Sequence, residues 1–103
     1  MTTLERLQSW YLSQCDGDWE HQSGVHIDTI DNPGWRARIS LTGTSIEKAP
    51  FESIRDERTE DNWIHAWIDV KDDKTVFNIA CGPENLAEAL KMFCDWAEVK
   101  DRP

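Results

Sequence analysis

The sequence predicts an α+β fold in which an antiparallel sheet of four to five strands is flanked by an N-terminal and a C-terminal helix. Three observations support this class. Apolar residues recur at helical spacing near both ends of the chain, they alternate with polar residues in between, and turn-forming residues separate the alternating stretches. Elements in this order pack as a helical layer on a sheet. We therefore expect both helices to cover the same sheet face.

Length and charge restrict the function. A chain of 103 residues is predicted to form one domain, residues 1–103, because this length buries roughly two-thirds of the surface exposed on unfolding. The net charge of −9 at pH 7 disfavours direct binding of nucleic acid, whose phosphates would be repelled, and favours a basic protein partner or simply high solubility. We find no signal peptide and no membrane-spanning run, and the three cysteines have no metal-type spacing. These features predict a cytoplasmic protein.

The first helix is expected to begin at a capping box, in which Thr2 stands three residues before Glu5. It should fade near Cys15, before Gly17. Its apolar stripe is predicted from the helical spacing of Leu4, Leu7, Tyr11 and Leu12. Trp10 lies beside this stripe, so it could extend the buried face or be exposed.

The stretch Cys15–His21 has no helical or alternating period and is predicted to be a structured loop. Its mixture of carboxylates and an indole suits binding to a basic protein, because the indole can anchor a contact while the carboxylates steer the partner. The structural alternative is that Trp19 and Trp35 fold inward while Asp16 and Asp18 cap backbone N–H groups. Both roles are compatible, since a loop held by a buried tryptophan is also a preorganised interface.

A β-hairpin follows the loop. Residues 25–30 form its first strand, and the Asp31-Asn32-Pro33-Gly34 turn uses a glycine that can adopt a positive φ. The second strand, residues 35–41, alternates cleanly, so that one face is buried and the other is wet. A third strand is predicted within residues 51–58, near a sheet edge, where alternating charges discourage edge pairing.

The last strands are residues 63–70 and 75–81, joined by a turn at residues 71–74. On the first of them, one face should carry Ile64, Ala66, Ile68 and Val70, and the other Trp63, His65 and Trp67. Residues 82–85 then open the second helix, with proline tolerated in its first turn. The apolar stripe of this helix is predicted to comprise Leu86, Ala89, Leu90, Phe93, Trp96 and Ala97.

The loop also contains groups that could hold a metal or do chemistry. The possible metal ligands are Asp16, Asp18, Glu20, His21 and His26. Their spacing is neither that of a calcium loop nor that of a zinc site. Cys15 could pair with a histidine as a nucleophile, but an acidic setting raises the pKa of a thiol. We therefore expect no metal, no cofactor and no catalytic residue. A small metal-dependent hydrolase using residues 16–26, and an adaptor binding basic peptides along a strand edge, remain as alternatives.

Several long motifs carry a resemblance to a known family. The motifs are Leu7-Gln8-x-Trp10-Tyr11, Gln14–His21, Thr29–Trp35, Gly43-Thr44, Glu60-Asp61-x-Trp63-Ile64 and Pro83-x-Asn85-Leu86. With these motifs the sequence resembles the immunity protein 53 family of bacterial polymorphic toxin systems, and the resemblance covers nearly the whole chain. The resemblance implies a small cytoplasmic protein, encoded beside a secreted toxin, that protects its producer by binding and blocking that toxin without catalysis.

The resulting hypothesis is a stoichiometric inhibitor of a cognate toxin. A basic toxin, such as many nucleases, would match the charge of −9. The chain itself is expected to be a monomer or weak dimer that contacts neither nucleic acid nor membrane. The partner-binding residues are predicted to be Asp16, Asp18, Trp19, Glu20, His21, Asp28, Asp31, Asn32 and Trp35.

Overall fold

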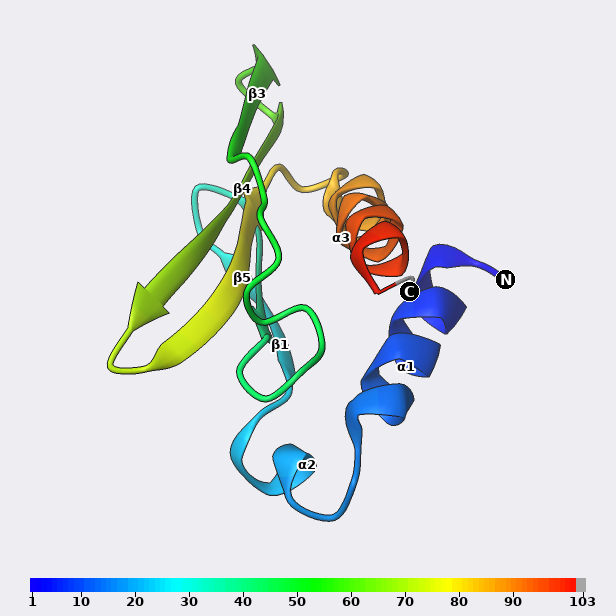
Figure 1. Cartoon of the computed structure of the whole chain (residues 1–103). Coiled ribbons are helices and arrows are strands. Elements are labelled where there is room, and N and C mark those ends of the chain that lie inside the picture. The colour runs from blue at the N-terminus through cyan, green and yellow to red at the C-terminus, as the bar shows by residue number, and fades with distance from the viewer. Residues whose placement is uncertain (102–103) are drawn as a thin grey trace.

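The computed structural model describes residues 1–101 and confirms the α+β class (Figure 1). The elements are α1 (Thr3–Gln14), α2 (Trp19–Gln22), β1 (Val25–Ile30), β2 (Gly34–Ser40), β3 (Ile54–Thr59), β4 (Asn62–Lys71), β5 (Lys74–Cys81) and α3 (Leu86–Lys100). The five strands form one antiparallel sheet in the order β1-β2-β5-β4-β3.

Both long helices lie on the same side of the sheet, as expected (Figure 1). The sheet residues beneath them are buried, and they alternate along the three central strands because side chains of a strand point to opposite faces. These buried residues are Ala37 and Ile39 on β2, Phe77, Ile79 and Cys81 on β5, and Ile64 and Ala66 on β4. The opposite face of the sheet is covered by none of the helices within residues 1–101.

Helix α1 begins at the predicted capping box, with Thr2 and Glu5 bonding each other's backbone N–H groups. The predicted apolar stripe is wrong in part, because Leu4 and Leu12 are 60% and 71% exposed. The helix instead buries Leu7 and Trp10. It packs against α3 rather than lying flat on the sheet, so only one narrow side is covered, and the Trp10 ring lies 5.0 Å from that of Phe93 on α3.

The stretch 15–21 is not a loop throughout, since α2 begins at Trp19 and ends at Gln22. A helix of one turn is too short to show a period in the sequence. Its start depends on a local contact instead. The Asp16 carboxylate accepts the N–H groups of Asp18 and Trp19, both at 2.9 Å.

The strands occur where they were predicted, with small differences. β3 is an edge strand, as expected, but it begins at Ile54, because Phe51 turns inward and packs on the rings of Phe77 and Trp96. Val70 shares a face with the buried residues of β4 yet is 72% exposed. The β4–β5 hairpin extends beyond the helices at that point (Figure 1).

Helix α3 buries the predicted stripe, with Leu90, Phe93 and Ala97 fully covered. Polar contacts fasten its outer side to the rest of the fold. Arg6 on α1 forms ion pairs with Asp95, at 2.7 Å, and with Glu98. These contacts give the two helices a fixed relative position over the sheet.

Candidate partner-binding surfaces

The structure separates the nine predicted binding residues into two groups at opposite ends of β1. Asp16, Asp18, Trp19, Glu20 and His21 precede the strand, in the segment we call the acidic loop (residues 16–21). Asp31, Asn32 and Trp35 lie at the turn that follows the strand, and Asp28 lies between the groups on β1 itself. A strand of six residues spans about 20 Å, so the two groups form separate surfaces.

Two carboxylates of the acidic loop have structural partners. Glu20 accepts the N–H groups of Asp16 and Gly17 at 3.0 and 2.9 Å, while Asp16 caps α2 as described above. Hydrogen bonds from the backbone of Trp19 and then Asp18 lower the pKa of Asp16. Backbone N–H groups, its own first and then that of Asp16, lower the pKa of Glu20. Both side chains therefore stay ionised while they hold the loop in one shape.

Trp19 anchors the same loop from inside. Its side chain is buried, and its indole Nε1 donates to the Thr42 carbonyl at 3.0 Å. Its ring packs edge-on against Trp10 at 6.1 Å. Asp16, Asp18 and His21 are exposed, and the side chains of Asp18 and His21 have no hydrogen-bond partner within residues 1–101. Trp19 thus positions the acids and is itself out of a partner's direct reach.

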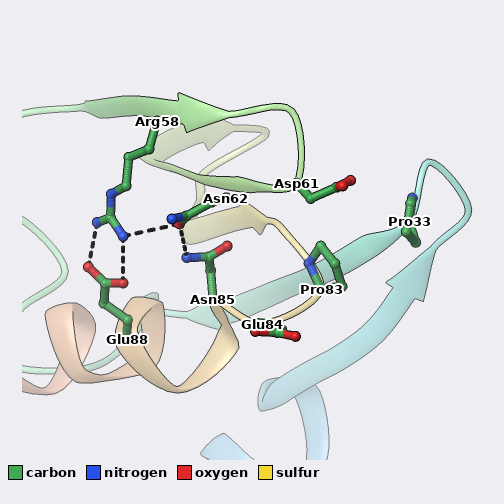
Figure 2. A pocket seen from close by; sticks show the side chains of 8 residues that line it. All are labelled: Pro33, Arg58, Asp61, Asn62, Pro83, Glu84, Asn85 and Glu88. Atoms are coloured by element: carbon green, nitrogen blue, oxygen red, sulfur yellow. Dashed lines mark hydrogen bonds and ion pairs between the residues drawn. The ribbon is translucent and has the colours of Figure 1, made fainter.

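The turn that holds Asp31 and Asn32 contributes Pro33 to a cleft of about 590 Å³ at the other end of the sheet. Three loops meet there: the β1–β2 turn, the β3–β4 turn and the segment between β5 and α3 (Figure 2). The lining residues are Pro33, Arg58, Asp61, Asn62, Pro83, Glu84, Asn85 and Glu88. Asp31 and Asn32 directly precede Pro33 in the sequence, and both are exposed.

A continuous hydrogen-bond network forms the inner wall of the cleft (Figure 2). Asn85 is buried, its Oδ1 accepts the backbone N–H of Trp63, and its Nδ2 donates to the side-chain Oδ1 of Asn62 at 2.8 Å. Arg58 donates to the same Asn62 oxygen and grips Glu88 through two hydrogen bonds, which lowers the pKa of Glu88. These side chains already have partners, so the wall holds three segments together rather than presenting reactive groups.

Two glycines allow the loops to approach so closely. A Cβ on Gly34 would lie 2.3 Å from the Cys81 carbonyl oxygen, and one on Gly82 would lie 2.5 Å from that of Asp61. The prediction that Gly34 supplies a positive φ is therefore wrong, because it sits in extended backbone where its small size is what matters. Trp35 adds to the junction, since its indole donates to the Pro83 carbonyl at 3.0 Å.

The sequence motifs acquire a common explanation at this junction. Asn32–Trp35, Glu60–Trp63 and Pro83–Leu86 are far apart in the chain and meet around one cleft. Sequence reasoning missed the roles of Arg58, Asn85 and Glu88. The one available signal was Asn85 directly before a helix, a position that usually indicates capping, whereas its side chain bonds the β4 backbone instead.

A third feature is a groove of about 400 Å³ between α1 and β1. It is lined by Leu7, Gln8, Tyr11, Ser23, Gly24, Val25 and His26. β1 is an edge strand, so one side of its backbone is not paired within the sheet. An extended segment could pair there with its side chains in the groove.

Residues 1–101 form no candidate metal site, and their two buried thiols are poor nucleophiles. Within residues 1–101, no group of three or more His, Cys, Asp or Glu could hold a metal ion. Burial raises the pKa of the Cys81 thiol to about 11 and also raises that of Cys94, which makes both poor nucleophiles. No helix in the same part of the chain is long and apolar enough to cross a membrane.

The fold and the surfaces describe a small α+β protein. The polar side chains described above hold its loops in place, and these loops lie next to exposed acidic segments. The family model for immunity protein 53 matches residues 4–98, and the chain belongs to this family. Neither the curated proteins nor the solved structures contain a match to the chain.

Proposed function

We propose that this protein binds a cognate toxin and neutralises it stoichiometrically, and that the region of the toxin it contacts is basic. Membership of the immunity protein 53 family supports a toxin as the partner. The acidic contact surface is inferred from the loop at residues 16–21. There, backbone hydrogen bonds and the buried Trp19 hold ionised carboxylates in fixed positions. Asp18 in this loop, Asp28 on β1 and Asp31 in the turn after β1 add exposed charges.

The mechanism is occupancy. A net charge of −9 attracts a basic partner from a distance and raises the association rate. Because the loop is already ordered, little conformational entropy is lost on binding. If the toxin is a nuclease, these carboxylates would occupy positions that otherwise receive substrate phosphates. The three free cysteines fit a reducing compartment, so we place this inhibition in the producer's cytoplasm.

The test measures association with the toxin domain encoded beside this gene. The variant Asp18→Asn/Asp28→Asn/Asp31→Asn should lower the association rate constant about tenfold at low salt. The deficit should shrink as salt rises, because the Debye length falls from about 30 Å at 0.01 M to about 3 Å at 1 M. Stopped-flow fluorescence at several salt concentrations gives both quantities.

The matched control removes equal charge elsewhere on the surface. Glu52→Gln/Asp72→Asn/Asp73→Asn changes exposed acids in the loop before β3 and in the β4–β5 turn, and it should retain most of the wild-type rate. Equal rates for wild type, variant and control would contradict the acidic surface. A neighbour-encoded toxin that the wild-type chain neither binds nor inhibits would contradict the function itself.

A second candidate, an adaptor for basic peptides, is favoured by the unpaired edge of β1 and the groove beside it. The other sheet edge is less suitable, because β3 carries four consecutive charged residues. Titration of the ¹⁵N-labelled chain with a lysine-rich decapeptide separates the candidates. Saturable shifts confined to α1 and β1 would favour the adaptor, and unchanged spectra would exclude it.

A further inference from the structure

We propose that the open face of the sheet, opposite the helices, is a second contact surface that receives an acidic segment of the toxin. This inference rests on the proposed function for the identity of the partner. It concerns a surface distinct from the acidic loop and of opposite chemistry. The open sheet face is defined here by seven residues on β2, β5 and β4: Arg36, Arg38, Asn78, Ala80, Trp63, His65 and Trp67.

Strand register places these side chains together. Residues directly opposite each other in antiparallel strands project to the same face. From β2 through β5 to β4, two rows cross the sheet: Arg36–Ala80–His65 and Arg38–Asn78–Trp67. The alternate residues Ala37 and Ile39 are fully buried beneath the helices, so both rows must lie on the uncovered side.

The two arginines are available to a partner. Arg6, Arg55 and Arg58 each form ion pairs with carboxylates. Arg36 and Arg38 are exposed and form none with any residue in 1–101, although the register sets Asp28 opposite Arg36. Guanidinium groups bind carboxylates through paired hydrogen bonds. Two arginines that lack an ion pair in the described residues and lie on one face of a chain with charge −9 are therefore suited to an acidic ligand.

Tryptophans form the opposite side of the same surface. Trp67 is half-buried, and its indole donates to Asp69 at 3.1 Å, as does the amide of Asn78 at 3.3 Å. These bonds fix the ring and occupy the Asp69 carboxylate. Glu57, which the register sets opposite Trp63, is likewise paired, with Arg55 and His65. Trp63 is also half-buried and lies 5.1 Å from the His65 ring. Tryptophan and arginine are the residue types that most often dominate the energy of protein interfaces.

Between the arginines and the tryptophans, β5 contributes only the short side chains of Ala80 and Asn78, both half-buried. The surface is thus low in the middle and carries cations on one side and indoles on the other. An acidic segment of the toxin would direct carboxylates to Arg36 and Arg38 and apolar groups to the indoles. Opposite charges at two separate places on the inhibitor would also select one orientation of the toxin.

The experiment measures the dissociation constant for a catalytically inactive form of the neighbour-encoded toxin domain by calorimetry. Arg36→Glu/Arg38→Glu should raise the dissociation constant about 100-fold, because carboxylates would then face carboxylates. The control Lys48→Glu/Lys100→Glu reverses the same number of charges at exposed sites off this face, and we expect a change of less than about threefold. The milder Arg36→Gln/Arg38→Gln should fall between them, and thermal unfolding checks that each variant is folded.

The outcomes separate this inference from the function on which it rests. If the wild-type chain binds the toxin and both arginine variants bind it equally tightly, the open sheet face is not a contact surface for the toxin. The proposed function would still stand. Absence of toxin binding by the wild-type chain would overturn both. Self-association of the wild-type chain that disappears in Arg36→Glu/Arg38→Glu, measured by sedimentation without toxin, would assign the face to a second copy and overturn the proposed occupant.

Discussion

Asp16 and Glu20 are ionised side chains that remain in contact with water while they accept backbone N–H groups. A neighbouring acid, Asp18, has no side-chain hydrogen bond to the part of the chain that the structure describes. Residues of the same type, within one short segment, therefore differ in role. The first two shape the loop, whereas the third is free to meet a partner.

This difference predicts a pH-dependent effect on stability. The folded-state pKa values of Asp16 and Glu20 are lowered. Their contribution to the free energy of unfolding is therefore fully present above the unfolded-state pKa values of about 4, and it is lost as the pH falls through the folded-state values. Asp16→Ala/Glu20→Ala should therefore lower the free energy of unfolding at pH 7 and have progressively less effect below pH of about 4. Urea unfolding across this range provides the measurement.

Asp18→Ala is the control, and it should leave the free energy of unfolding at pH 7 nearly unchanged, because its carboxylate accepts no hydrogen bond from residues 1–101. A destabilisation of Asp16→Ala/Glu20→Ala that is as large in acid as at neutral pH would show that these carboxylates do not act through their ionised forms.

At the scale of elements, the decisive contacts are those between loops that follow different strands. Gly34 begins β2 against the end of β5, and Gly82 follows β5 against the β3–β4 turn. The Arg58–Glu88 ion pair then ties β3 to α3. The cleft between these loops depends on the close approach of their backbones at the two glycines. Contacts between side chains alone would not bring the backbones so close.

Gly34→Ala and Gly82→Ala should each lower the free energy of unfolding, by about 1–3 kcal/mol. The added Cβ would meet backbone oxygen at 2.3 and 2.5 Å, respectively, and backbone cannot move aside as a flexible side chain can. Gly24→Ala is the matched control, because a Cβ there has nothing within 4 Å, and it should be neutral or stabilising by up to about 1 kcal/mol. Chemical unfolding of the three variants checks this, and similar losses in all three would contradict it.

On the scale of the whole molecule, one hydrophobic cluster joins both long helices to the sheet. It includes Leu7 and Trp10 from α1, Phe93 from α3, and residues from the three central strands. Three aromatic rings form its centre, since Phe93 lies 5.0 Å from both Trp10 and Phe77. A shared core of this kind couples the stability of all its elements.

We therefore expect residues 1–103 to unfold as a single domain in one cooperative transition. Far-ultraviolet circular dichroism reports mainly the helices, and tryptophan fluorescence reports residues in both the helices and the sheet. The two probes should give the same midpoint in urea. Separate midpoints would mean that the helical layer and the sheet are independent folding units.

Local pattern was sufficient to predict most of the fold. The alternation in β2, β4 and β5 and the helical spacing in α3 each place apolar residues on one side, because a buried face demands it. The pattern was insufficient for α1, where Leu4 and Leu12 match the period and yet are exposed. Which part of a helix is covered depends on its neighbour, and that neighbour, α3, is about 80 residues further along the chain.

The fold class, the family motifs and the acidic character of the loop at residues 16–21 follow from the sequence alone, because these depend on composition and on neighbouring residues. Tertiary contacts establish which charged side chains have partners. They pair Arg58 with Glu88 from another element, leave Arg36 and Arg38 without an ion pair to any residue in 1–101, and separate Asp18 from Asp31 by the length of β1. Ion pairing depends on distance in space, which strand register and loop contacts establish after the local patterns have formed.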